Sequence, residues 1–433
     1  MSNRSLITSM KNVRLLAASS GALGWESAFF YPSSPAIVVK GASASQDDLL
    51  VGDFNGIIHR IGLWSGTEHA TFQTSDAVRG LVHSDNVVYA NAGASLVAYK
   101  IDPPTLLWTR AMNDIAWGVP QIANGIVYSG SWDGKLYAIR TDGTPAWIST
   151  AFDFWAAEPI VENGVVYAKA WEKLVALDAA TGKVIWTATA PNNANITGSA
   201  CYGDGRVYIG TAWGGLLCAF NASTGELVWS SNFGGHPTPP TYRGGRVFAS
   251  AEHGAGDGYL KSFDAADGHL LWTSQVPVGN AGDAISRAVF GGLYDNKVFV
   301  ASQNGTAYAF YRTTGQLVWQ KGVGATWPND PKWTEQTEVG PWAFEHEVGE
   351  YRTIDPLALL LRGDIYVKLN LPYPVPIEAL MVRVRLAAQG MSENQKRIAL
   401  KQLNNLNRVA ESLKKAITMP REQRAKTRSA RKK

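Results

Sequence analysis

The stretch Leu177–Trp186 reads LDAATGKVIW and places a polar turn with a glycine four residues before a tryptophan. Glycine adopts positive φ without a steric penalty, so it suits a tight turn that leads into the next strand. The same phrase returns as FNASTGELVW (Phe220–Trp229), FDAADGHLLW (Phe263–Trp272) and FYRTTGQLVW (Phe310–Trp319). A turn and a tryptophan that recur together indicate a repeated structural unit.

The aromatic residues that close these units recur over most of the chain. They fall at Phe72, Trp108, Trp147, Trp186, Trp229, Trp272 and Trp319, with spacings of 36 to 47 residues. In one clean unit, residues 118–149, four short apolar runs are separated by turns that contain Asn-Gly or Asp-Gly, pairs that favour hairpins. The markers predict an all-β, seven-bladed β-propeller of four-stranded antiparallel blades over residues 34–323, after an N-terminal arm at residues 1–33.

The repeated tryptophan has an architectural interpretation. A single four-stranded sheet cannot bury both of its faces, so each Trp is expected to pack against the neighbouring blade. Such packing removes roughly 150–250 Å² of aromatic surface from water per residue. The repetition therefore predicts a fold and, by itself, no chemistry.

These units resemble the pyrroloquinoline-quinone (PQQ) enzyme repeat, which ends in an Asp-x-x-Thr-Gly turn followed by a Trp. The match is good in Gly205–Trp229 and in Gly164–Trp186, and the resemblance covers about Pro35 to Val323. It implies a quinoprotein-like propeller, a fold that hosts many functions.

Quinoprotein dehydrogenases of this kind bind quinone and Ca²⁺ at the propeller centre and usually carry a disulfide between adjacent cysteines. Here the two cysteines, Cys201 and Cys218, are predicted on the first and third strands of one blade, too far apart for a disulfide. The acidic residues show no clustering typical of a Ca²⁺ loop. We therefore expect no enzymatic activity, no cofactor and no metal, and keep a quinone-dependent dehydrogenase as an alternative.

A second alternative is an envelope assembly factor that resembles the propeller lipoprotein of the outer-membrane β-barrel assembly machinery. That role needs a signal peptide and a lipidated Cys. We expect neither, because Lys11 and Arg14 stand where a signal peptide requires apolar residues and no Cys that could carry a lipid follows the weak apolar patch after Arg14. The chain has no run of 18 apolar residues, so membrane insertion is not expected either.

One rim of the propeller is predicted to be aromatic and polar, because the loops after the second and fourth strands of each blade share one face. The candidate residues are Phe54, Asp114, Trp117, Trp132, Asp153, Trp155, Trp171, Trp213, His236 and His253. Aromatic side chains beside polar groups suit stacking on a glycan or a protein contact. The alternative is that these aromatics pack sideways onto the next blade. No catalytic triad or metal-binding spacing occurs among the histidines.

The sequence changes character after Val323. Residues 324–352 are polar and aromatic without a repeat and are predicted as a linker; residues 353–419 are predicted as a strand–helix–helix docking or oligomerisation module of α+β type. Its last helix carries a heptad seam that includes Leu403, Leu406, Leu413 and Ile417. This helix could pair within the chain as a hairpin or between chains as a short coiled coil.

The end of the chain is basic. Residues 420–433 hold seven Lys or Arg residues against one Glu, and Arg424 and Arg428 are candidate assembly contacts. The net charge of the whole chain is +4, so the propeller is close to neutral. Nucleic acid is therefore not expected as a partner, except through this tail.

These features together predict a non-enzymatic scaffold that belongs to a large assembly of proteins. Without an expected export signal, the specific hypothesis is a bacteriophage virion component, a tail or capsid appendage. Residues 324–433 would anchor it, and the rim would bind a glycan or another host-surface ligand.

Overall fold

The repeats form strands where apolar residues alternate, and several of their turns place a glycine after Asn or Asp. The turn residues Asn124 and Gly125 both have positive φ, 49° and 73°, as a two-residue hairpin turn requires. This turn joins β12 (Ala116–Ala123) to β13 (Ile126–Ser131), and the two strands pair antiparallel. The expected all-β class is confirmed by the structure.

The computed structural model describes residues 4–8, 13–17, 20, 22–27, 33–42, 46–152, 157–212, 215–252, 258–276, 289–290, 296–302, 306–322 and 342–345. All of them lie within one compact unit, Met1–Val348. The predicted module at 353–419 and the basic tail at 420–433 lie outside the described residues. So do the assembly candidates Leu403, Leu406, Leu413, Ile417, Arg424 and Arg428.

The described strands form eight antiparallel sheets, which we number by their order along the chain. Sheet 1 contains β1 (Arg4–Thr8), β2 (Val13–Ala17), β3 (Leu23–Glu26) and β33 (Trp342–Glu345), and sheet 2 contains β4 (Ile37–Val39), β5 (Asp48–Gly52), β6 (Ile57–Gly62) and β7 (Glu68–Gln73). Sheet 3 contains β8 (Val78–Ser84), β9 (Val87–Ala92), β10 (Ser95–Lys100) and β11 (Thr105–Ala111), and sheet 4 contains β12, β13, β14 (Leu136–Arg140) and β15 (Pro145–Ser149).

The remaining four sheets repeat the same plan. Sheet 5 contains β16 (Ala157–Glu162), β17 (Val165–Ala170), β18 (Lys173–Asp178) and β19 (Val184–Thr189), and sheet 6 contains β20 (Ile196–Gly203), β21 (Arg206–Thr211), β22 (Leu216–Asn221) and β23 (Leu227–Asn232). Sheet 7 contains β24 (His236–Pro237), β25 (Thr241–Arg243), β26 (Arg246–Glu252), β27 (Gly258–Asp264) and β28 (Leu270–Val276), and sheet 8 contains β29 (Val289–Phe290), β30 (Lys297–Ser302), β31 (Thr306–Tyr311) and β32 (Leu317–Gly322). A 3₁₀ turn, η2 (Pro191–Asn193), joins sheets 5 and 6.

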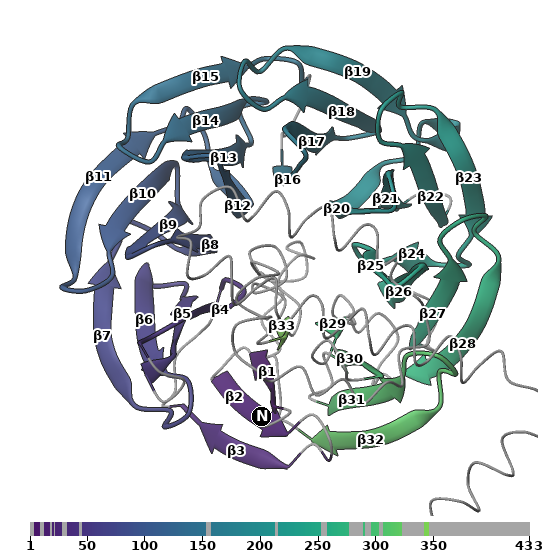
Figure 1. Ribbon diagram of the computed structural model, residues 1–433, viewed down its shortest axis with the longest axis horizontal. Helices are drawn as coiled ribbons and strands as arrows, with labels where there is room; N and C mark the ends of the chain where they lie inside the picture. Colours follow the sequence, from purple (N-terminus) through teal and green to yellow (C-terminus); the bar gives the residue numbers. More distant parts are fainter. Residues whose placement is uncertain are drawn as a thin grey trace, which may run out of the picture. The chain divides into compact units, whose positions relative to one another are not determined.

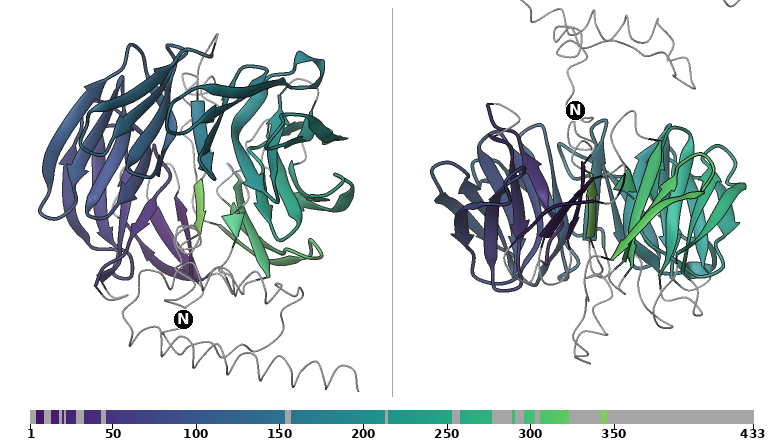
Figure 2. Two further views of the ribbon diagram at one scale, coloured as in Figure 1. Left: turned by 45° about the horizontal axis from the view of Figure 1, so that its top comes forward. Right: turned by 90° about the horizontal axis from the view of Figure 1, so that it is seen from below.

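The sheets stand around a central axis, as in a β-propeller (Figure 1). The first strand of each repeat lies nearest the axis and the fourth lies at the circumference. In the side view of Figure 2, the strands of one sheet turn from the inner to the outer edge, as the right-handed twist of a β-sheet dictates.

Sheet 1 was not among the seven predicted blades, and it joins the two ends of the described chain. Strands β1–β3 lie within the region predicted as an arm, and β33 lies within the region predicted as a linker. β33 pairs antiparallel with β1, with Trp342 opposite Thr8 and Glu345 opposite Ser5. The described strands therefore include parts of both regions, and they form an eighth sheet beside the seven that carry the sequence markers.

β2 packs against both neighbours of sheet 1. Val13 and Leu15 belong to a cluster with Leu49 and other core residues of sheet 2. Leu16, which points to the opposite face of the strand, belongs to a cluster with Trp319 and the core of sheet 8. These contacts close the ring of sheets between the last repeat and the first marked one.

The repeated tryptophans contact the next sheet, as predicted. The indole of Trp147 lies over Gly182 of the following turn, where an added Cβ would approach the ring to 2.6 Å, and Gly182 has a φ of 71°. Trp186 lies over Gly225 in the same way. Both close approach and positive φ favour glycine at this position, which explains why the turn and the Trp recur together.

At three of the described interlocks a Trp and a Tyr also donate hydrogen bonds to the same carbonyl oxygen. Trp186 Nε1 donates to Ala222 O at 3.0 Å, and Tyr167 Oη donates to the same oxygen at 3.2 Å. Trp147 and Tyr128 share Ala179 O in the preceding interface. Burial raises the pKa of Tyr128 and of Tyr167 to about 12. These tyrosines are therefore neutral donors over the physiological pH range.

Candidate functional site

The structure describes six of the ten predicted rim residues. Phe54 lies in the turn between β5 and β6, Trp132 between β13 and β14, and Trp171 between β17 and β18. Asp114 precedes β12, Trp117 lies within β12 and His236 lies within β24. The other four, Asp153, Trp155, Trp213 and His253, lie outside the described residues.

Three of these residues come together around an arginine that the sequence reasoning missed. The Arg79 guanidinium carbon lies 5.8 Å from the centre of the Phe54 ring and 5.0 Å from that of Trp117. Trp117 in turn contacts Trp132, with ring centres 4.8 Å apart and an interplanar angle of 32°. We call Phe54, Arg79, Trp117 and Trp132 the rim cluster. It spans sheets 2, 3 and 4.

The members of the rim cluster differ in exposure. Trp117 is buried, with 7% of its surface exposed, whereas Phe54, Arg79 and Trp132 are half-buried. A guanidinium between two aromatic rings gains cation–π energy, which increases when the group is partly desolvated. The cluster therefore combines buried Trp117, an arginine whose Nε and Nη1 atoms are buried, and two half-buried aromatic residues. Trp and Arg are enriched at protein contact sites.

The turn that carries Phe54 is fixed by a buried carboxylate. Asp53 is 1% exposed, and its Oδ1 accepts hydrogen bonds from Ile57 N at 2.7 Å and Asn55 N at 3.0 Å. The backbone of sheet 3 joins this turn, because Val78 N donates to Asp53 O at 3.1 Å. Phe54 and Arg79 each adjoin one of these bonded residues.

The turn that carries Trp132 is bound to the chain before β12. Trp132 N donates to Ile115 O at 3.0 Å, and Ser131 Oγ donates to Asp114 O at 3.1 Å. On the other side of the turn, Tyr137 Oη donates to Asp133 at 2.5 Å. Burial, and then this hydrogen bond, raise the pKa of Tyr137 to about 12. Asp114 itself is exposed beside the cluster.

Trp171 and His236 lie in sheets 5 and 7, apart from the three sheets that form the rim cluster. Trp171 has a φ of 52° and is 46% exposed. A positive φ is uncommon for a bulky residue, and here the Trp171 carbonyl accepts a hydrogen bond from Ile196 N at 2.8 Å. The structure therefore groups three of the six described rim residues and leaves Trp171 at a separate exposed position.

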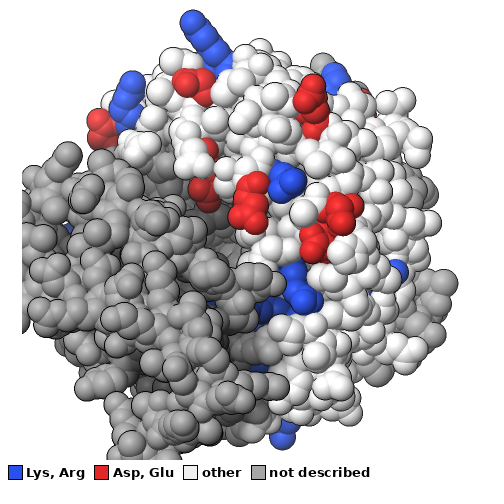
Figure 3. All heavy atoms as spheres, turned by 45° about the vertical axis from the view of Figure 1, so that its right-hand side comes forward, with Lys and Arg blue, Asp and Glu red and all other residues white. Residues whose placement is uncertain are grey.

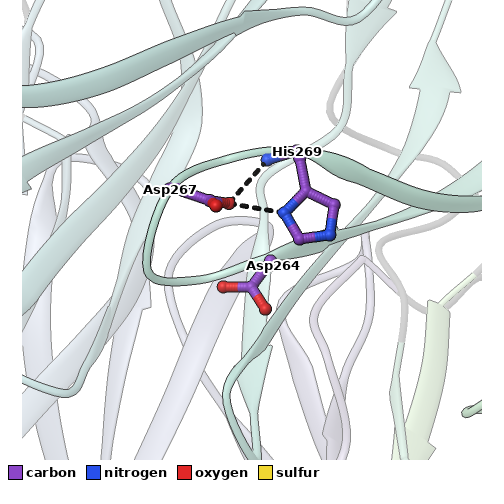
Figure 4. A group of neighbouring side chains, drawn as sticks. All are labelled: Asp264, Asp267 and His269. Carbon is purple, nitrogen blue, oxygen red and sulfur yellow. Dashed lines mark hydrogen bonds and ion pairs between the residues drawn. The ribbon is translucent and has the colours of Figure 1, made fainter.

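A second group of polar side chains lies in the repeat turn of sheet 7. Asp264, Asp267 and His269 have potential ligand atoms within 4.8 Å of one another (Figure 4). Asp267 replaces the Thr of the other copies, and its Oδ1 accepts from His269 N at 3.0 Å and contacts His269 Nδ1 at 2.6 Å. These hydrogen bonds lower the pKa of Asp267. The contacts are those of a local turn, and all three side chains lie at the surface or half-buried.

Both cysteines are buried, and they lie on β20 and β22, the first and third strands of one sheet, as predicted. Burial raises the pKa of the Cys218 thiol to about 12, so this thiol is unreactive at neutral pH. On the side of the ring drawn in Figure 3, acidic and basic side chains are interspersed and most of the surface of the described residues is uncharged. Within the described part of the chain, no helix has the length and apolar character needed to cross a membrane.

Comparison with known proteins gives the family. The family model described as outer membrane protein assembly factor BamB, of the PQQ-like repeat type, matches residues 94–199 and 170–337. Together these matches span more than half of the chain. The chain belongs to this family. As a PQQ-like propeller it retains the repeat turns and the tryptophans that interlock the sheets. No curated protein sequence matches the chain.

Solved structures share the fold of this PQQ-like propeller at low identity. The computationally designed Ika8 protein has a TM-score of 0.57 and 17% identity, over 72% of this chain and 96% of its own. BamB from Moraxella catarrhalis has a TM-score of 0.54 and 17% identity, over 69% and 88%. The quinohemoprotein alcohol dehydrogenase ADHIIG from Pseudomonas putida HK5 has a TM-score of 0.53 and 14% identity, over 68% and 66%. At these identities the likeness concerns the fold alone.

Proposed function

We propose that this PQQ-like propeller is a non-enzymatic binding protein, which contacts a protein or glycan through the rim cluster. The observation that carries the proposal is the grouping of Phe54, Arg79, Trp117 and Trp132 across three sheets. Aromatic rings and a guanidinium supply stacking and hydrogen-bond donors, which are contact chemistry. The acidic and imidazole side chains among the described rim residues are those of Asp114, which precedes the first strand of sheet 4, and His236, which lies in sheet 7.

We further propose that residues 324–433 attach the propeller to a larger assembly, specifically a bacteriophage virion in which it forms a tail or capsid appendage. The heptad seam and the basic tail support an anchoring role, since both offer contacts that a closed, nearly neutral propeller lacks. β33 lies in this region, so the anchoring segment proper is residues 349–433, beyond the unit that ends at Val348.

An envelope assembly role is the second candidate, and the family match with BamB favours it. The location of the protein distinguishes the virion role from the envelope assembly role. Mass spectrometry of density-purified phage particles should detect the protein at a fixed ratio to the known structural proteins, and removal of residues 349–433 should abolish its incorporation. Recovery with envelope membranes and absence from particles would overturn the virion proposal and support the second candidate.

The rim proposal is tested by site-specific photo-crosslinking. A benzophenone amino acid in place of Trp132 should give one dominant crosslinked adduct in the cell that produces the protein. If the ligand is a glycan, the wild-type protein should bind on a glycan array, and Trp132→Ala should abolish this binding. The same probe at Ile148, which is 49% exposed on β15 of the same sheet, is the matched control. Equal labelling from both positions would contradict a binding role for the rim cluster.

The alternative enzymatic role has a direct assay. Purified protein incubated with PQQ and Ca²⁺ should show no quinone absorbance after desalting and no dye reduction with alcohols or sugars. Reproducible dye reduction would replace the binding proposal with a dehydrogenase.

A further inference from the structure

A buried amide joins sheets 3 and 4 directly beneath the rim cluster. Asn91, in β9, is fully buried, and its Nδ2 donates to Gly118 O at 3.0 Å and lies 3.5 Å from Trp117 O. Its Oδ1 accepts a hydrogen bond at 2.8 Å from Ser129 Oγ, which is also fully buried. One side chain of sheet 3 therefore holds both the first and the second strand of sheet 4.

Packing alone does not require an amide at this position. Asn91 stands opposite Leu96 in its sheet, and the residues in the equivalent place of sheets 2, 4 and 6 are Gly52, Gly130 and Gly210. A buried amide is costly unless its hydrogen bonds are made, and here partners are present on both its donor and its acceptor atom. The geometry therefore indicates that the role of Asn91 is to form these hydrogen bonds with sheet 4.

The segment that Asn91 holds is poorly fixed by its own sheet. The register between β12 and β13 shifts between Trp117 and Gln121, and Gly118 has a φ of 72°. The regular ladder of backbone hydrogen bonds is thus interrupted directly after the residue that contacts both Arg79 and Trp132. The side-chain amide of Asn91, at the carbonyls of Trp117 and Gly118, takes the place of the interrupted ladder.

We propose that Asn91 is the positioning residue of the rim cluster, and that its amide holds Trp117 in contact with Arg79 and Trp132 before any ligand binds. This inference rests on the proposed binding role only for its biological purpose. A preformed contact surface loses less side-chain freedom on binding than one that must order itself.

The test reads the Trp117–Trp132 pair in the unliganded full-length protein. Two indoles 4.8 Å apart couple excitonically, and the difference between the far-ultraviolet circular dichroism of the wild type and of Trp132→Phe isolates their signal. Asn91→Ala should lose most of this difference signal. Asn91→Asp should lose it too, because it keeps the Ser129 contact and removes the N–H donors.

Lys169→Met is the matched control. Lys169 occupies the equivalent place in sheet 5, opposite Leu174, and its Nζ donates to Ile196 O of the next sheet at 3.3 Å. This variant should keep the Trp117–Trp132 signal. Ser129→Ala, which removes one partner of the Asn91 acceptor only, should reduce the signal partially and covers the case in which Asn91→Ala does not fold.

Retention of the full signal in folded Asn91→Ala or Asn91→Asp would overturn the inference. Loss of the signal in Lys169→Met as well would show a general loosening of the ring, which would also contradict a specific role for Asn91. Neither outcome depends on a ligand, so a failure here is distinct from a failure of the crosslinking test.

Discussion

Ser262 is a polar residue at the position opposite the repeated Trp, where most of the other sheets have an apolar residue. It is fully buried opposite Trp272, and its Oγ has no hydrogen-bond partner. The residue opposite the repeated Trp is alanine in five other sheets, namely Ala98, Ala138, Ala176, Ala219 and Ala309. A buried hydroxyl without a partner keeps its desolvation cost.

We expect Ser262→Ala to leave the free energy of unfolding unchanged or to raise it by up to about 1 kcal/mol. Urea denaturation measures the change. Ser129→Ala is the matched control, because the Ser129 hydroxyl is equally buried but bonded to Asn91, and its loss should cost about 1–3 kcal/mol. A clear destabilisation by Ser262→Ala would mean that its hydroxyl has a partner after all.

The repeated Trp combines a large apolar surface with one hydrogen bond, and the two contributions are separable at Trp229. Trp229→Ala should lower the free energy of unfolding by about 3–5 kcal/mol, through loss of a large buried aromatic side chain. Trp229→Phe should cost less, because Tyr208 Oη still donates to Ala265 O after the indole N–H is removed. Equal melting temperatures for the wild type and Trp229→Ala would contradict the interlock.

At the scale of elements, two tyrosines in second strands of the sheets make the stability of the sheet interfaces depend on pH in the alkaline range. The pKa of Tyr128 and Tyr167 is raised to about 12 in the fold, against about 10 in an unfolded chain. The folded state thus favours the neutral phenol, so this contribution is complete below about pH 10 and is lost as the pH rises toward 12.

The double variant Tyr128→Phe/Tyr167→Phe should therefore lose stability less steeply between about pH 10 and 12 than the wild type. Thermal melts across this range give the slopes. Tyr311→Phe, which removes a phenol that is 42% exposed, is the control. A double variant with the wild-type slope would assign the alkaline loss to other groups.

The repeat made seven sheets predictable, because each copy ends in an aromatic residue and five of the seven have a Gly four residues before it. Sheet 1 was missed although Gly21 precedes Trp25 by the same four residues, and Trp25 Nε1 donates to Leu63 O of sheet 2 at 2.8 Å. Its turn lacks the polar residues of the copies that end at Trp186, Trp229, Trp272 and Trp319, and its innermost strand follows the last repeat. A local pattern cannot report a strand that arrives from the other end of the chain.

The candidate site was partly predictable for a similar reason. Phe54, Trp117 and Trp132 were identified by their positions in the repeat, and the structure brings them together. Arg79 was missed because a single arginine in the first strand of a repeat carries no aromatic or spacing signal. Asn91 was missed because its role depends on contacts with another sheet, which become visible only in three dimensions.

At the scale of the whole molecule, the ring depends on β33. The fragment 1–348 retains β33, whereas a fragment 1–323 lacks the partner of β1. We expect 1–348 to melt cooperatively and at a temperature several degrees above that of 1–323, because the shorter fragment leaves sheet 1 with an open inner edge. Differential scanning calorimetry compares the two.

The double variant Ala343→Pro/Phe344→Pro in 1–348 is the control for chain length. Neighbouring N–H groups of a strand point to opposite sides, so one of the two prolines must remove a donor from the pairing with β1. This variant should melt like 1–323. Identical melting of all three proteins would mean that β33 adds nothing to the ring.

The pairing of β1 with β33 also has a consequence for the order of synthesis. β1 leaves the ribosome before the other described strands, and its partner is completed only at Glu345, after all of them have been made. During that interval the inner edge of β1 presents unpaired backbone groups, which are a template for pairing with another nascent chain. Translation of residues 9–341 therefore sets a period in which this edge can pair with another chain, and the period ends when β33 arrives.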